Sequence, residues 1–208
     1  MAKEGIPSIY DYTLDELKEK LKPSFRAKQV YNWLYKKYAN SYDEMKNIPN
    51  ELKEDLKANY PIDVMTIIKK EQSIDGSIKY LFKLRDNLTV EAVLLLMKDK
   101  KKDEDGNIIR SEKYTVCISS QVGCKVGCTF CLTAKGGCVR NLTVGEYIAQ
   151  IVNIKRDNDI AENKALNIVY MGMGEPLDNF TNFIKAVSIF SELDGLAISR
   201  RRQTVSTS

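Results

Sequence analysis

The segment YTVCISSQVGCKVGCTFC, residues 114–131, joins a strand pattern to a loop rich in cysteine. It holds four of the five cysteines of a 208-residue chain that contains no histidine. YTVCIS has the β-branched and apolar residues of a strand. The loop after it places Cys124, Cys128 and Cys131 in a C-x3-C-x2-C pattern. Because the chain has no imidazole, a soft metal centre would be bound through these thiols.

The residues after the cysteine loop alternate between helix and strand patterns. Thr143-Val-Gly-Glu146 is a capping box that predicts a helix to about Lys155. LNIVYM, residues 166–171, is apolar throughout, as a buried parallel strand is. Residues 181–192 predict another helix, and QTVSTS, residues 203–208, a third strand. Strands that alternate with helices indicate a parallel sheet or part of a barrel.

The residues before the cysteine loop divide into a helical part and a strand part. A capping box at Thr13-Leu-Asp-Glu16, apolar residues at helical spacing from Arg26 to Tyr38, and Pro49 predict three helices. From Val64 the pattern changes to three strands, VMTIIKKEQ, IKYLFKL and LTVEAVLLLM, with turns at Asp75-Gly76 and near Asp86. The charged segment KDKKKDEDGN, residues 98–107, is expected to form a hairpin tip.

These patterns predict an α/β protein in three parts. We expect a small helical domain over residues 1–60. A β-rich connection over residues 61–112 would carry Glu91, and an α/β core would fill residues 113–208. The last strand pattern reaches residue 208 with no helix after it to cover the sheet edge. We therefore expect the sequence to be the N-terminal portion of something longer.

Composition excludes several classes of protein. The apolar content of 43% and charged content of 29% are those of a globular protein, and no run reaches the length of a membrane span. The N-terminus lacks a secretory signal, so we expect a cytoplasmic protein, in which clustered cysteines bind metal or do chemistry. Residues 113–145 carry four basic groups and no carboxylate, and Arg200, Arg201 and Arg202 follow. This favours an anionic partner, although a solvated basic face would give the same pattern.

The cysteine spacing is open to two interpretations. Three thiolates on one short loop can bind three irons of a cubane cluster and leave the fourth iron open. Structural zinc requires four ligands, and Cys117 or Cys138 would have to complete the set. A second signal is Met171-Gly-Met-Gly-Glu-Pro176, at the end of the apolar strand, where parallel α/β folds bind ligands. Its glycines would let backbone approach a ligand closely, and Glu175 can accept from an ammonium group.

The two signals together resemble the radical S-adenosylmethionine (SAM) superfamily. More narrowly, VEAV around Glu91, CISSQVGC, TFC, RNLT, MGMGEPL and TVSTS are similar to the RlmN-type dual-specificity RNA methyltransferases. These motifs run in family order from about residue 88 to residue 208. The resemblance implies that residues 113–208 form the first half of a radical SAM core, a partial (βα)6 barrel. It also implies that the helical residues 1–60 form the small accessory, RNA-binding domain of the family, although they carry no diagnostic motif.

The resemblance also implies a function and its residues. The family methylates C2 of an adenosine in 23S rRNA and in tRNA through a 5′-deoxyadenosyl radical. Cys124, Cys128 and Cys131 would hold a [4Fe–4S] cluster. Gly174, Glu175 and Ser206 match SAM-contacting positions. An external, flavodoxin-like electron donor and a monomeric state are expected.

Glu91 and Cys117 match two further positions of the family. Glu91 would accept the proton. Cys117 would resolve a covalent protein–RNA adduct by forming a disulfide with a methyl-carrying cysteine, which in the family lies far beyond residue 208. These 208 residues are therefore expected not to methylate RNA alone. Cys138 stands where the family usually has an aromatic residue and is interpreted as packing.

Three alternatives stay open on the sequence. One is a Cfr-type enzyme, which methylates C8, although Pro176 favours the RlmN type. Another is a radical SAM enzyme with a substrate other than RNA. The third is a zinc-stabilised RNA-binding module without catalysis.

Overall fold

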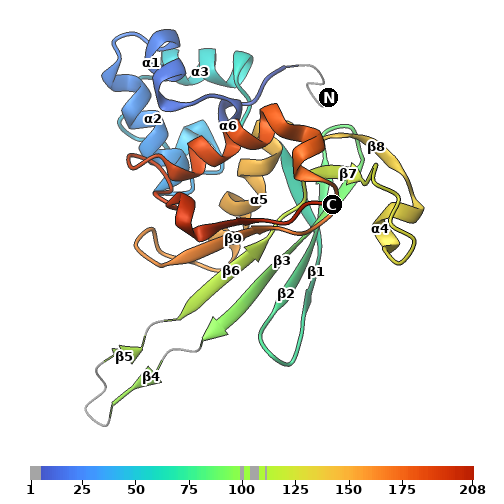
Figure 1. The fold of residues 1–208 in the computed structure, drawn as a ribbon. Helices are drawn as coiled ribbons and strands as arrows, with labels where there is room; N and C mark the ends of the chain where they lie inside the picture. Colours follow the sequence, from blue (N-terminus) through green and yellow to red (C-terminus); the bar gives the residue numbers. More distant parts are fainter. Residues whose placement is uncertain (1–5, 99–100, 104–107, 111) are drawn as a thin grey trace.

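The computed structural model describes residues 6–98, 101–103, 108–110 and 112–208, and a mixed six-stranded sheet organises them (Figure 1). The strands lie in the order β1-β2-β3-β6-β9-β10. Their bounds are β1 Met65–Gln72, β2 Ile78–Leu84, β3 Thr89–Lys98, β6 Lys113–Cys117, β9 Leu166–Tyr170 and β10 Gln203–Val205. Strands β1, β2, β3 and β6 pair antiparallel, whereas β6, β9 and β10 pair parallel. The predicted class, an antiparallel extension joined to the first part of a partial (βα)6 barrel, is confirmed.

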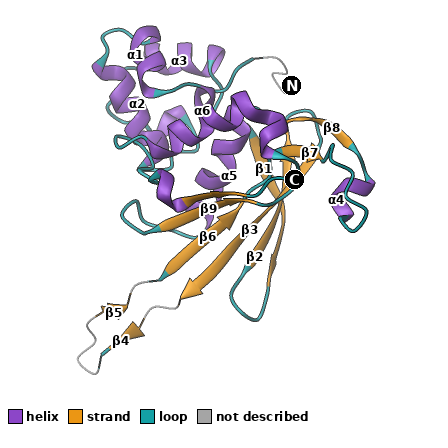
Figure 2. Ribbon diagram, viewed as in Figure 1, coloured by secondary structure: helices purple, strands orange, loops and turns teal. Residues whose placement is uncertain are grey.

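Two crossover helices connect the parallel strands. α5 (Val144–Asp157) lies between β6 and β9 in the chain, and α6 (Phe180–Ser191) lies between β9 and β10. Both lie on the same face of the sheet and pack against each other, with the N-terminal helices beyond them (Figure 2). In the described part of the chain there are thus two complete strand–helix units and a third parallel strand.

Alternation along the strands gives the sheet two different faces. Tyr80 and Phe82 of β2, and Val90 and Ala92 of β3, are buried beneath the helices. The residues next to them in the chain point to the opposite face, where the side chains of Lys79 and Glu91 are 48% and 42% exposed. A strand places successive side chains on opposite faces, so this second face, the open face, follows from the register.

The N-terminal helices share a hydrophobic core with the sheet. They are α1 (Leu14–Lys20), α2 (Phe25–Tyr35) and α3 (Asn50–Asn59), with short 3-10 turns η1 (Ile9–Asp11) and η2 (Tyr42–Glu44). The capping box predicted at Thr13 is present, with reciprocal hydrogen bonds to Glu16. Pro49, expected in the first turn of α3, is its N-cap. The domain boundaries at residues 60 and 112 stay predictions.

A hairpin within the cysteine loop was not predicted from the sequence. β7 (Gln121–Gly123) pairs antiparallel with β8 (Cys138–Asn141), and α4 (Leu132–Lys135) lies between them. At the other end of β3, β4 (Lys101–Lys102) pairs with β5 (Ile108–Arg110). The expected charged tip over 98–107 falls partly outside the described residues, at 99–100 and 104–107. Within the described part, no helix combines the length and apolar character needed to cross a membrane.

Candidate cofactor site at the end of the parallel strands

Segments that follow β6, β9 and β10 meet at one edge of the sheet, because parallel strands end on the same side. The amide of Gly172 donates to the carbonyl of Ile118 at 3.1 Å, and that of Ser120 donates to Met173 at 2.7 Å. The amide of Ser208 donates to the Glu175 carboxylate at 3.0 Å. The structure therefore brings together the start of the cysteine loop, the GMGEP turn and the segment that contains Ser206.

The Glu175 carboxylate is fixed by backbone amides. Its side chain is the N-cap of the short 3-10 helix η3 (Pro176–Asn179) and accepts from the amide of Leu177 at 3.0 Å. The other oxygen accepts from Ser208, and the amide of Glu175 itself donates to the side chain of Gln121 at 3.0 Å. The residue is only 9% exposed. These contacts give the carboxylate one orientation at the edge of the sheet.

The glycines of the turn are required by neighbouring protein backbone. A Cβ on Gly172 would lie 2.7 Å from the carbonyl oxygen of Ile118. A Cβ on Gly174, whose φ is +100°, would lie 2.6 Å from the amide nitrogen of Gln121. The sequence predicted that these glycines let the backbone approach a ligand closely. In the structure they let it approach the protein segment 118–121, which joins β6 to the cysteine loop.

The three predicted cluster ligands share a loop without converging on one point. In the described residues, no three side chains of histidine, cysteine, aspartate or glutamate form a ready metal-binding group. Cys124 follows β7 and its amide donates to Gly137 at 2.9 Å, while Cys131 is the N-cap of α4. All five cysteines are free thiols, so the structure does not support the disulfide expected at Cys117.

The donor chemistry of the loop nevertheless fits an iron–sulfur cluster. Hydrogen bonds from the backbone amides of Ala134 and Thr133 lower the pKa of the Cys131 thiol. This favours thiolate, the form that binds metal. Cys124 lines a hollow of about 470 Å³, together with Lys125, Gly137, Cys138 and Asp178. Three free thiols on one loop, one of them beside open space, suit a thiolate-bound cluster. The fold holds both ends of this loop in the β7–β8 pair.

Glu91 and Cys117 both lie on the open face of the sheet. Cys117 is the register partner of Val93, which is two residues from Glu91 on β3. The Lys79 ammonium is 2.7 Å from the Glu91 carboxylate. Burial raises the pKa of the Cys117 thiol, while a backbone hydrogen bond from Met171 opposes the shift. The structure thus places the predicted proton acceptor and the predicted resolving cysteine on neighbouring strands of one surface.

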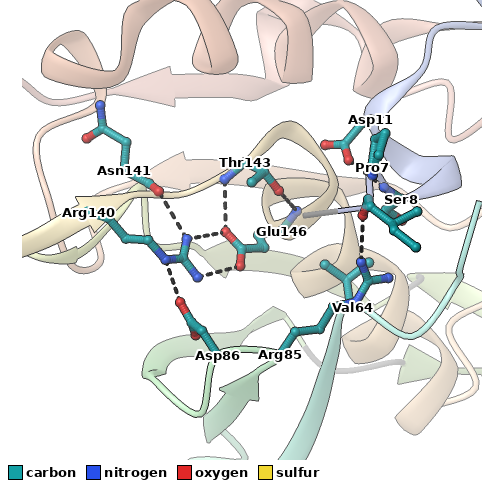
Figure 3. A pocket seen from close by; sticks show the side chains of 11 residues that line it. Pro7, Ser8, Asp11, Val64, Arg85, Asp86, Arg140, Asn141, Thr143 and Glu146 are labelled. Atoms are coloured by element: carbon teal, nitrogen blue, oxygen red, sulfur yellow. Dashed lines mark hydrogen bonds and ion pairs between the residues drawn. The ribbon is translucent and has the colours of Figure 1, made fainter. Parts of the chain in front are cut away.

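Several basic residues that were predicted to meet an anionic partner contact the protein's own carboxylates or backbone instead. Arg140 is 2.7 Å from Asp86 and donates twice to Glu146 at 2.8 Å, beside a hollow of about 550 Å³ near the start of α5 (Figure 3). Lys125 is 3.3 Å from Asp178. Arg200–Arg202 form the 3-10 turn η4 at the N-terminal end of β10, whereas the cysteine loop lies at the C-terminal ends of the parallel strands. The charge pattern therefore overstated the basic surface near the site.

Three polar side chains that connect these loops were not predicted from the sequence. Gln121 is fully buried and contacts Asn141 and Asp178 as well as Glu175. All three lie in or beside the motifs CISSQVGC, RNLT and MGMGEPL, but single-sequence reasoning gave no reason to choose them. Their roles depend on contacts between residues 20 to 57 positions apart.

Comparison with known proteins agrees with this geometry. Residues 10–62 match the ribosomal RNA large subunit methyltransferase N-terminal domain. The whole chain is 90% identical to the dual-specificity RNA methyltransferase RlmN of Aliarcobacter butzleri and covers 58% of that protein. It is 59% identical over 202 residues to the RlmN of Sulfurimonas denitrificans and covers 57% of it.

A solved structure has the same fold. The crystal structure of a radical SAM methyltransferase from Sphaerobacter thermophilus superposes with a TM-score of 0.85 at 40% identity. The match covers 97% of this chain and 57% of that one, so the chain spans somewhat more than half the length of these relatives. The resemblance to the RlmN-type RNA methyltransferases is thereby confirmed, in sequence and in fold, over essentially the whole of this chain.

Proposed function

We propose that this chain is the cluster- and SAM-binding part of an enzyme that methylates C2 of an adenosine in 23S rRNA and in tRNA. The observation that carries the proposal is the meeting of the cysteine loop, the Glu175 turn and the segment after β10 at one sheet edge. The relatives named RlmN support the substrate class. A cytoplasmic location, a monomeric state and a flavodoxin-like electron donor belong to the same proposal.

The cofactor-binding residues have distinct proposed roles. Cys124, Cys128 and Cys131 would hold the cluster, and Gly174, Glu175 and Ser206 would bind SAM. When bound, the cluster and SAM supply the radical chemistry that a carbon as unreactive as C2 of adenine requires. The amide-bound Glu175 carboxylate is oriented to accept from a ligand's ammonium group at the edge of the sheet.

Two residues of the open face would act on the RNA itself. Glu91, oriented by Lys79, would accept the proton that leaves C2. The Cys117 thiol would release the methylated RNA from a covalent bond to the protein. Their shared face is the surface on which a target adenine would have to lie, with its base outside any stack.

Iron analysis tests the metal assignment. After anaerobic purification the protein should contain iron and sulfide, and Cys128→Ala should abolish iron binding because three thiolates are needed. Cys138→Ala is the matched control, since Cys138 lines the same hollow as Cys124 but is not a proposed ligand. Zinc in place of iron, or iron retained in Cys128→Ala, would contradict the proposal.

Nucleoside analysis tests the reaction in the cell. Inactivating the gene should remove 2-methyladenosine from 23S rRNA and tRNA, and the intact gene should restore it. A gene with Cys128→Ala should not. Loss of 8-methyladenosine instead would indicate Cfr-type chemistry, and unchanged RNA would refute an RNA substrate.

A further inference from the structure

Gln121, to which no catalytic or cofactor role has been assigned, lies at the centre of a polar cluster. Its side chain is fully buried. The carbonyl oxygen accepts from the Glu175 amide at 3.0 Å, and the amide nitrogen donates to Asn141 at 2.7 Å and to Asp178 at 2.8 Å. An amide N–H can only donate and a carboxylate can only accept, so the partners fix which way the glutamine points.

The cluster joins three separate segments. Gln121 is in β7, which leads into the cysteine loop, and Asn141 ends β8, which leads out of it. Asp178 and Glu175 belong to the turn after β9. In a second connection, the side-chain amide of Asn141 donates to the backbone carbonyl of Asp178 at 3.3 Å. The two ends of the cysteine loop are therefore fastened to each other and to the turn that bears Glu175.

We propose that Gln121 is a positioning residue that couples the cysteine loop to the Glu175 turn and so sets the affinity for SAM. The inference rests on the proposed function of that turn. Gln121 is three residues before Cys124, and Gly174 packs directly against its backbone. A shift of either loop must therefore move the other or break these hydrogen bonds.

Replacing the glutamine should weaken SAM binding through displacement of Glu175. In Gln121→Leu, the buried Glu175 amide loses its partner, which is costly unless the turn moves toward water. Asn141 and Asp178, which are partly open to solvent, each lose the hydrogen bond that ties them to the cysteine loop. We expect the Kd for SAM, measured by calorimetry on iron-loaded protein, to rise about tenfold or more. Hydrogen exchange at the amides of residues 172–178 should increase even without SAM.

Asn158→Leu provides a matched control for a general loss of stability. Asn158 donates to the Tyr80 hydroxyl and to the Ile154 carbonyl, each at 2.7 Å, at the far end of α5. This variant should lower the free energy of unfolding but leave the Kd for SAM and the exchange of residues 172–178 unchanged. A purely structural role for Gln121 would give both variants the same behaviour.

A reversal of hydrogen-bond polarity gives a second test if Gln121→Leu fails to fold. In Gln121→Glu, one carboxylate oxygen can still accept from the Glu175 amide, but the other faces the Asp178 carboxylate, so SAM affinity should fall. Adding Asp178→Asn supplies an amide donor to the new carboxylate. The double variant should recover most of the lost affinity, while Asp178→Asn alone should not bind SAM better than the unsubstituted protein.

The outcomes separate this inference from the function on which it rests. Failure of the unsubstituted, iron-loaded protein to bind SAM would overturn the proposed function, and the inference with it. Normal SAM binding by the unsubstituted protein and an equal Kd in Gln121→Leu would overturn the inference alone. An unrescued double variant, with iron content still normal, would also overturn it.

Discussion

Gly174 illustrates how a single residue can be fixed by close approach of the backbone. Its φ of +100° lies in the region that residues with a Cβ avoid, and the atoms around it are the backbone and Cβ of Gln121 and the hydroxyl of Ser120, all within 2.6 Å of where a Cβ would be. Gly127 also has a positive φ, of +77°, but a Cβ there would meet nothing within 4 Å. A comparison of Gly127 with Gly174 therefore distinguishes the energy of backbone strain from the energy of a steric clash.

Alanine at these two glycines should therefore have unequal effects. Gly127→Ala carries only the backbone strain, about 1 kcal/mol. Gly174→Ala adds a clash in a packed site, and we expect it to lower the free energy of unfolding by roughly 3 kcal/mol in total. Urea unfolding of both variants measures the difference. Equal losses would show that the turn moves away from Gln121 at little cost.

Among single residues, the sequence predicted the candidate cofactor-binding residues but not the buried residue that holds their loops in place. The cysteines and the GMGEP turn were found because metal ligands and glycines have recognisable spacing. Gln121 was not found, because a buried glutamine has no signature of its own until its partners are known. The interpretation of Cys138 as packing stays a prediction, and its position beside Cys124 makes it the sharper control.

At the scale of elements, local signals predicted most of the secondary structure. The capping boxes at Thr13 and Thr143 begin α1 and α5, as expected, because each satisfies the first amides of its helix from nearby side chains. The strand over 78–84 has the predicted bounds. The β7–β8 hairpin was missed because its short strands are held by long-range pairing across the cysteine loop, which no local pattern specifies.

The start of α5 also has a partner that the sequence did not indicate. Asp11, in η1, accepts from the amide of Gly145 at 2.6 Å and from the amide of Ser8 at 2.7 Å. The Thr143 capping box satisfies the amide of Glu146 but not that of Gly145. A carboxylate from the N-terminal segment thus completes the cap of a helix 134 positions away.

Removal of this carboxylate should weaken the junction between the N-terminal segment and α5. We expect Asp11→Ala to lower the free energy of unfolding by about 1–2 kcal/mol, as loss of a helix cap does. Asp15→Ala is the control, since the Asp15 side chain is 86% exposed and an ion pair with Lys18 in solvent should contribute little to stability. Thermal or urea unfolding of both would decide, and an effect of Asp15→Ala as large as that of Asp11→Ala would contradict the assignment.

At the scale of the whole molecule, the fold separates basic groups that the sequence suggested were one surface. Lys135 lies on α4 within the cysteine hairpin, which follows the C-terminal end of β6, whereas Arg201 lies just before the N-terminal end of β10. The net charge of +4 contains no information about this separation. Which basic groups meet RNA depends on the parallel arrangement of β6, β9 and β10.

The salt dependence of RNA binding tests that separation. If RNA is bound at the cysteine-loop edge, Lys135→Ala should reduce the slope of log affinity against log salt by about 0.7, the contribution of one phosphate on a single strand. Arg201→Ala should leave the slope unchanged. The measurement uses a loop RNA between 50 and 200 mM salt. A reduced slope in Arg201→Ala alone would place the RNA at the N-terminal end of β10.

A buried lysine lies where the helical region, α5 and the loop before β9 meet. Lys155 is 1% exposed, and its ammonium lies 5.2 Å from the centre of the Tyr38 ring and 3.5 Å from the Ala161 carbonyl. Burial lowers the pKa of Lys155 to about 8, while Glu162 opposes the shift. Because the native state disfavours the charge, this group destabilises the fold wherever it is protonated in both states, which is below about pH 8.

Replacing this lysine should therefore stabilise the protein in a pH-dependent way. From pH 8 to about 10.5 the unfolded chain binds the proton more tightly than the native one, so the penalty fades as pH rises. Lys155→Met should raise the free energy of unfolding at pH 7 by up to roughly 3 kcal/mol, less whatever the contacts with Tyr38 and Ala161 contribute. The difference in free energy of unfolding between Lys155→Met and the unsubstituted protein should shrink from pH 8 to 9 to 10 in urea unfolding. The buried tyrosines, which also titrate at high pH, are present in both proteins and do not change this difference.

Lys28→Met is the control, because the Lys28 side chain is 59% exposed and its replacement should show little change in stability at any pH. An advantage of Lys155→Met that stays constant with pH would mean that it comes from packing and not from removal of a buried charge.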